Sequence, residues 1–187
     1  MRKYNTICSI IIILLLGVHA VTGMFQLTGV TAGGGTLREV FSWVMGGFVV
    51  LHIIMGTILT VQTMCALKAA GKAYFRENIE FWVRRISGLA LILLIFYHVI
   101  IFTGESGEVF RLNTFAGLEL AGSLLLVLAL SVHIASNIRP LLISFGIAGR
   151  KVYVRDILLI LAIVCVACAA AFLVYYFRWN ISWRYGS

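Results

Sequence analysis

Charged residues and proline are scarce in this chain. Of its 187 residues, 12% are Asp, Glu, Lys or Arg, one is proline, and 61% are hydrophobic. A water-soluble domain of this size does not have such a composition. The sequence therefore excludes a soluble enzyme and predicts an integral membrane protein.

Long polar segments are also missing, and short ones separate five apolar runs. Each run is long enough to cross about 30 Å of hydrocarbon at 1.5 Å per residue. The runs cover approximately residues 7–29, 41–66, 86–104, 113–137 and 156–177. The predicted fold class is all-α integral membrane, with residues 1–187 forming a single transmembrane domain of five transmembrane helices.

The first run also resembles a secretory signal peptide, because Arg2 and Lys3 precede an apolar core and Ala20 follows it. The apolar run continues through Val30, however, which is longer than a typical signal core. We therefore expect it to be retained as the first span.

Basic residues are distributed unevenly over the segments between the runs. With the N-terminus inside, eleven Lys and Arg residues fall on cytoplasmic segments and four on outer ones. Since cytoplasmic loops carry an excess of Lys and Arg, we expect a cytoplasmic N-terminus and an outer C-terminus in the inner membrane of a bacterium or archaeon. The net charge of +8 follows from this topology, so the expected partner is membrane lipid and not nucleic acid.

Cysteine contributes little to the prediction. Cys165 and Cys168 form a C-x-x-C inside the fifth run, without a nearby histidine or base. We expect all four cysteines to be small packing residues.

Histidine is rare too, but its placement is informative. The chain has four histidines, one in each of the first four runs: His19, His52, His98 and His133. An ionisable group in hydrocarbon costs several kcal/mol and is usually retained for a function. A neutral imidazole is the usual axial ligand of a b-type haem, and facing helices of a bundle can supply two of them. The pattern predicts two haem b groups in a bundle of the first four helices; a histidine that only bridges helices by hydrogen bonds is the other interpretation.

Depth in the membrane suggests one pairing. His19 and His98 each lie about a dozen residues, or roughly 18 Å, from the cytoplasmic end of their spans. They could share an outer haem. His133 lies near the inner end of its span, whereas His52 lies near the middle of an overlong run, so pairing these two requires a tilt or shift of that helix.

Two glycines support the haem hypothesis. His19 and Gly23, like His52 and Gly56, are four residues apart and so lie on one helical face. A glycine there would clear space for a flat macrocycle, although small residues also serve ordinary helix packing in membranes.

Glu119 and Glu39 are candidates for proton exchange with a quinone. Glu119 lies in the fourth predicted span, about 40° from the face of His133 and about 21 Å away along the axis. We expect it to face the bundle interior near the outer haem; a carboxylate that reaches the outer interface is the alternative.

Two segments resemble the cytochrome b subunits of succinate dehydrogenase and fumarate reductase. Residues 78–88, with Arg85-Ile-Ser87-Gly88 at their end, resemble that family's R-x-[ST]-G segment before a haem-binding helix. Residues 133–146 resemble its H-x-x-x-G-I-R segment, with Asn137 in place of the glycine and Ser144 in place of an acid. Together with five spans and one histidine in each of the first four, the two segments resemble the single-subunit, two-haem, five-helix anchor type.

This resemblance implies a ligand set and partners. It implies an outer haem on His19 and His98 and an inner haem on His52 and His133. Arg85 and Ser87 match positions associated with quinone or haem-propionate contacts, and Arg139 follows the second motif; positive-inside anchoring is the alternative for each arginine. The implied partners are an iron–sulfur subunit on the cytoplasmic face and a flavoprotein that interconverts succinate and fumarate.

The loops expected from these spans are too short to bind a flavin or a soluble substrate. The chain would then be the quinone-reactive membrane subunit of an oxidoreductase complex, using menaquinone or another quinone. Some two-haem members have a glutamate two residues before the fourth-span histidine for proton transfer, but Ser131 occupies that position here. The rival hypotheses are a haem subunit of a formate dehydrogenase, hydrogenase or thiosulfate reductase, and a haem-free transporter or assembly factor.

Overall fold

The computed structural model describes residues 1–32, 35–72, 79–103, 115–146 and 151–185, without the side chains of 151–152 and 182–185. Within these ranges it consists of five α-helices and contains no strand. The helices are α1 (Arg2–Thr28), α2 (Thr36–Ala69), α3 (Ile79–Phe102), α4 (Gly117–Ser144) and α5 (Lys151–Tyr185). All five are long and apolar enough to span a membrane, which confirms the predicted five-helix fold.

The helix ends differ from the predicted spans. Helices α2 and α5 extend beyond the apolar runs 41–66 and 156–177 at both ends, because helical hydrogen bonding continues into polar residues. Helix α1 starts before the run 7–29 and ends at Thr28. Helix α3 begins at Ile79 instead of residue 86. Helix α4 begins at Gly117 instead of 113 and continues to Ser144 instead of 137. Residues 104 and 113–114 of the predicted spans lie outside the described residues.

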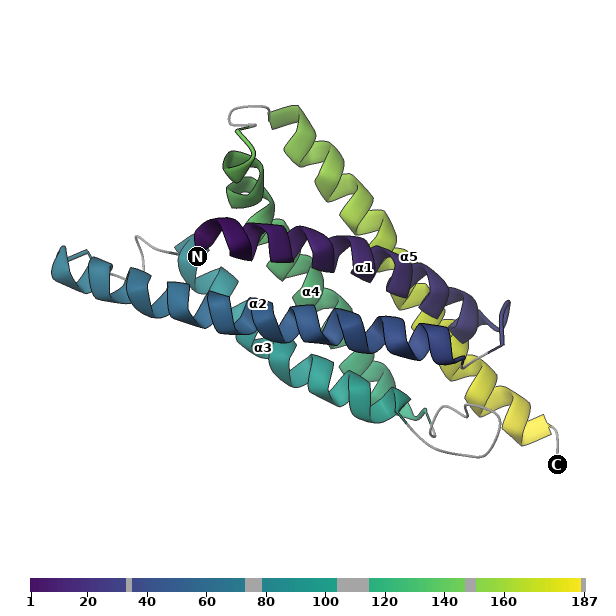
Figure 1. Cartoon of the computed structure of the whole chain (residues 1–187). Coiled ribbons are helices and arrows are strands. Elements are labelled where there is room, and N and C mark those ends of the chain that lie inside the picture. The colour runs from purple at the N-terminus through teal and green to yellow at the C-terminus, as the bar shows by residue number, and fades with distance from the viewer. Residues whose placement is uncertain (33–34, 73–78, 104–114, 147–150, 186–187) are drawn as a thin grey trace.

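The helices form two antiparallel pairs and a fifth helix (Figure 1). Helix α1 packs against α2, α3 packs closely against α4, and α5 packs against α4 and α1. The backbones of the α1–α2 pair and the α3–α4 pair approach each other much less closely. Helix α1 begins and α5 ends at opposite ends of the bundle (Figure 1).

A cluster of buried side chains lies at the end of the bundle where α1 ends. It comprises Leu27, Ile101, Phe115, Ala171, Phe172 and Tyr175. We call this region the aromatic end. The opposite end, where α3 begins, carries Arg84 and Arg85, and we call it the basic end.

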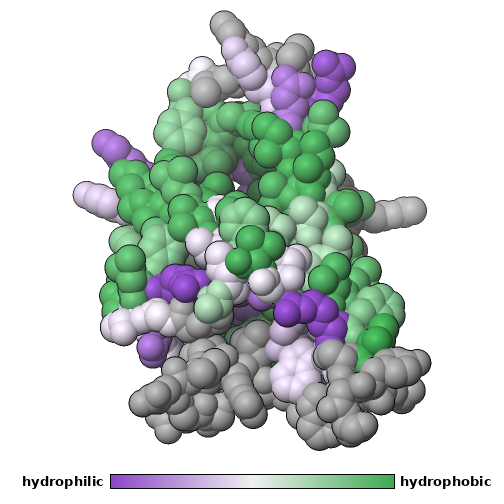
Figure 2. Space-filling model, turned by 90° about the vertical axis from the view of Figure 1, so that its right-hand side faces the viewer, coloured by the Kyte–Doolittle hydropathy of each residue, from purple (hydrophilic) through white to green (hydrophobic). Residues whose placement is uncertain are grey.

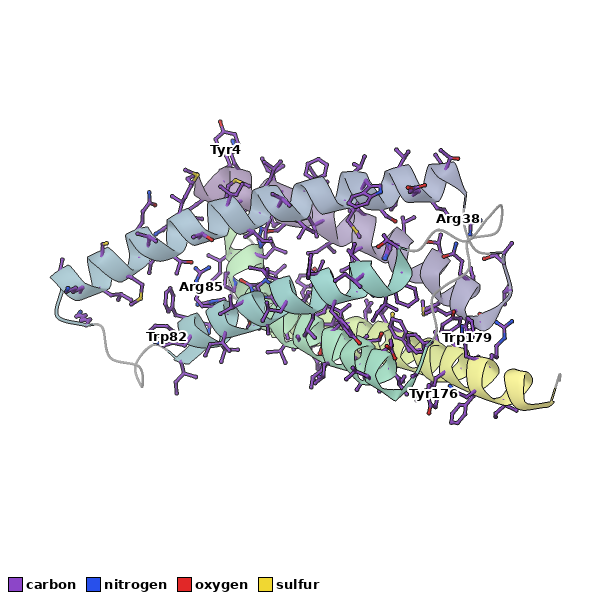
Figure 3. The ribbon with its side chains drawn as sticks, turned by 90° about the horizontal axis from the view of Figure 1, so that it is seen from below. Tyr4, Arg38, Trp82, Arg85, Tyr176 and Trp179 are labelled. Atoms are coloured by element: carbon purple, nitrogen blue, oxygen red, sulfur yellow. The ribbon has the colours of Figure 1, made fainter. Side chains whose placement is uncertain are left out.

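Most other large apolar side chains are exposed, especially on α2 and α5. Figure 2 shows hydrophobic residues covering much of the flanks, with hydrophilic residues in smaller patches. Trp82 and Trp179 lie towards opposite ends of the bundle (Figure 3), where amphipathic rings favour the headgroup region of a bilayer. This surface is that of a multi-pass membrane protein.

Pro140 interrupts the hydrogen bonding of α4 near the basic end. Proline has no N–H, so it cannot donate to the carbonyl of Ser136, four residues earlier. The Arg84 side chain of α3 donates to this carbonyl instead, with an Nη1–O distance of 3.5 Å. A polar group freed by proline in a membrane helix is thus satisfied by the neighbouring helix.

Candidate functional site

The four histidines form two pairs, and each pair connects the α1–α2 helix pair with the α3–α4 helix pair. The ring centroids of His19 on α1 and His98 on α3 are 6.2 Å apart. Those of His52 on α2 and His133 on α4 are 6.4 Å apart. The structure thus brings together the same partners that depth and motif resemblance suggested.

These separations can be compared with the geometry of a metal held by two imidazoles. Metal–nitrogen bonds of about 2.0–2.1 Å on opposite sides of the metal place the two ring centroids about 6.3 Å apart. Both histidine pairs lie close to this value. The paired ring planes are nearly perpendicular, at 74° and 86°.

The two pairs lie at different heights in the bundle. Ser42 of α2 contacts His19, and Ser9 of α1 contacts His52, so the pairs are ten residues apart along both helices. Ten residues of α-helix correspond to about 15 Å, or half of the hydrocarbon thickness.

Helix α2 accommodates its extra length by extending beyond the bundle. Its C-terminal end projects past the start of α1 (Figure 1), and this places His52 level with His133. The required shift is therefore achieved by extension of α2 at the basic end.

A serine hydroxyl lies next to three of the four imidazoles. The Oγ–Nδ1 distances are 3.4 Å for Ser42 and His19, 3.3 Å for Ser9 and His52, and 3.1 Å for Ser87 and His133. Sequence reasoning missed Ser9 and Ser42. The signal that could have identified them is their common spacing, because each precedes the histidine of its own helix by ten residues. In two antiparallel helices, equal spacing allows each serine to contact the histidine of the other helix.

His98 has different surroundings. Its ring lies 4.8 Å from the Phe102 ring and 6.5 Å from the Phe172 ring, measured between centroids. Its Nδ1 atom is buried and has no hydrogen-bond partner. A buried polar atom without a partner is costly, so this position requires an explanation.

Glycines border both pairs. A Cβ added at Gly23 or Gly56 would meet no atom within 4 Å, which fits the predicted clearance. Gly88 has a different role, because a Cβ there would lie 3.3 Å from Cε1 of His133. The absence of a side chain at Gly88 lets the His133 ring pack against α3.

The histidines come together in twos and not in larger groups of metal-binding side chains within the described part of the chain. Among the described residues, no group of three or more His, Cys, Asp or Glu side chains could hold a metal ion. A structural zinc site needs about four such ligands, whereas a haem iron needs only two axial ones.

Arg85 lies towards the basic end of the bundle, near Trp82 (Figure 3). Its positive charge is close enough to interact electrostatically with the imidazoles of both His52 and His133. Its guanidinium carbon lies 5.1 Å from the centroid of the Phe81 ring, and its Nε is buried without a hydrogen-bond partner. Arg139, by contrast, is exposed on α4.

The two candidate acids lie in the first turns of their helices. Glu39 is exposed at the start of α2. The Glu119 carboxylate accepts a hydrogen bond from the backbone N–H of Ala116, at 2.9 Å. Glu119 therefore caps the start of α4. This hydrogen bond restricts how far the carboxylate can turn towards the bundle interior, the orientation that the sequence predicts.

No family model, curated protein or solved structure matches this chain. Evidence for a function therefore comes from the residues and their geometry.

Proposed function

We propose that this chain is a dihaem cytochrome b subunit that anchors a succinate dehydrogenase or fumarate reductase and exchanges electrons with a membrane quinone. The observation that carries the proposal is the pair of separations, 6.2 and 6.4 Å, between histidines on facing helices. Two imidazoles at this spacing could together hold a haem iron.

The surroundings of each pair support the fit. His19 and His98 would hold an outer haem, and His52 and His133 an inner one. Gly23 and Gly56 leave open space beside the first ligand of each pair. Two pairs about 15 Å apart would bring two redox centres to different depths. When bound, haem supplies a one-electron relay between the two faces of the membrane.

The chain's own residues give each pair a distinct environment. Phe102, Phe172 and the rest of the aromatic end enclose His98 in apolar side chains and exclude water. The cation of Arg85 lies near the inner pair, and its partnerless Nε could donate to an anionic group such as a haem propionate.

The orientation and partners follow from the charge distribution. In the proposed topology the basic end faces the cytoplasm, where an iron–sulfur subunit would dock and connect to the flavoprotein. The dicarboxylate reaction belongs to that partner. Quinone, menaquinone or another type, would exchange protons near Glu119 or Glu39 on the outer side.

A reduced-minus-oxidised absorption spectrum of the purified protein tests the proposal. We expect b-type bands, and we expect the oxidised protein to give low-spin ferric EPR signals with the large anisotropy typical of perpendicular axial imidazoles. A high-spin signal would contradict ligation by two histidines. The absence of b-type bands would support a haem-free transporter instead.

Copurification in mild detergent tests the partner assignment. We expect a flavoprotein that reduces the haem with succinate or oxidises it with fumarate. A molybdenum or nickel subunit would assign the chain to a formate dehydrogenase, thiosulfate reductase or hydrogenase complex and contradict the proposed partner.

A further inference from the structure

We infer that Ser9, Ser42 and Ser87 are positioning residues that hold three imidazoles as the Nδ1–H tautomer and leave Nε2 of each free to bind a metal. That the metal is haem iron rests on the proposed function. The assignment of the serines rests on their hydrogen bonds.

Each of these serines uses its only hydroxyl proton within its own helix. The hydroxyl of Ser9 donates to the carbonyl of Asn5 at 2.8 Å, and that of Ser42 donates to the carbonyl of Arg38 at 2.9 Å. The hydroxyl of Ser87 donates to the carbonyl of Arg84 at 3.3 Å. For Ser9 and Ser42 the carbonyl is nearer than the imidazole, whereas Ser87 lies 3.1 Å from Nδ1 of His133. With each hydroxyl proton on the carbonyl, the oxygen that faces the imidazole accepts.

An accepting hydroxyl requires a proton on the ring nitrogen next to it. We therefore assign the ring proton of His19, His52 and His133 to Nδ1 and the lone pair to Nε2. Metal-bound histidines are oriented in this way, with the second ring nitrogen donating to a fixed acceptor.

The contacts between α1 and α2 are reciprocal. Ser9 of α1 orients His52 of α2, and Ser42 of α2 orients His19 of α1. Any sliding of one helix along the other would break both contacts. The two serines therefore fix the register of α1 and α2 as well as the ring orientation.

His98 is the exception, because its Nδ1 has no partner. Its ring is held by packing against Phe102 and Phe172. The inner pair thus has two oriented ligands, and the outer pair has one.

Nitrogen-15 NMR of histidine-labelled full-length protein, kept reduced so that any haem is diamagnetic, tests the assignment. We expect a protonated Nδ1 at His19, His52 and His133. Ser42→Ala, Ser9→Ala and Ser87→Ala should each alter the Nδ1–H signal of the partner histidine alone, and Ser→Thr at the same position should restore it. A proton on Nε2 in the native protein, or no response to the alanine substitutions, would overturn the inference.

Haem retention supplies a second readout. Loss of such a partner costs about 10–100-fold in metal affinity, so haem transfer to apomyoglobin should become more favourable by that factor in the alanine variants. Ser131→Ala is the matched control, because the Ser131 hydroxyl donates to Leu128 of its own helix and is exposed. Unchanged retention in all three alanine variants would contradict a positioning role.

The two proposals can fail separately. A native protein without haem would contradict the proposed function, while the NMR signals would still test the serines. A native protein with two haems and unresponsive serine variants would contradict only the positioning role.

Discussion

The His52–His133 and His19–His98 pairs, called inner and outer after the proposed topology, have nearly equal ring separations but are held in different ways. Both members of the inner pair contact a serine hydroxyl and lie near the cation of Arg85. In the outer pair only His19 has a serine contact, whereas His98 is packed among aromatic rings. One fold thus builds similar histidine pairs mainly from polar contacts at one end and with apolar packing at the other.

The largest expected effect follows from removal of a ligand. His98→Ala should eliminate the outer haem and His133→Ala the inner one, so that each variant keeps one haem per chain with a different midpoint potential. Pyridine haemochrome analysis and redox titration measure this. Loss of both haems in either variant would show that the pairs are not independent, and full haem content would refute the ligand assignment.

The second-largest expected effect is a reduced haem content when the space beside a histidine pair is filled. Gly23→Leu should affect the outer pair and Gly56→Leu the inner pair, because each of these open positions lies on the same helical face as the histidine four residues before it. Gly17→Leu and Gly47→Leu are matched controls at exposed positions of the same helices. Equal haem content in all four variants would contradict the proposed clearance.

Arg85→Gln should shift a potential without removing a haem. A nearby positive charge favours the reduced form, so its removal should lower the midpoint potential of the inner haem and leave the outer one unchanged. A tenfold change in the equilibrium corresponds to about 59 mV for one electron. Arg84→Gln, which removes the bond to Ser136, is the control. An equal shift of both haem potentials in Arg85→Gln would contradict the proposed difference between the pairs.

The smallest effect concerns Glu119. Glu119→Ala should destabilise the start of α4 by about 0.5–2 kcal/mol, whereas Glu119→Gln should keep the cap, because glutamine also accepts a hydrogen bond there. If the carboxylate exchanges protons with quinone, quinol-dependent reduction of the outer haem should be slower in both variants. A native rate in Glu119→Gln would restrict this residue to helix capping.

The five helices could be predicted because length and hydropathy determine them. Their ends could not, since α4 begins at a cap made by Glu119 inside the predicted run, and α2 extends into polar residues outside its run. The level of His52 was ambiguous for the same reason: sequence alone does not show how far one helix extends past its neighbours.

The histidines of the candidate site were identifiable because ionisable residues are rare in apolar runs. Ser9 and Ser42 were not, because serine is common in membrane helices and contacts between helices depend on register. The haem, the orientation in the membrane and the quinone site remain predictions.

The ratio of haem b to polypeptide in the purified protein tests the central claim most directly. Pyridine haemochrome absorbance, combined with quantitative amino-acid analysis, should give two haems per chain. A ratio of zero would contradict the account, and a ratio of one would show that only one of the two histidine pairs binds haem.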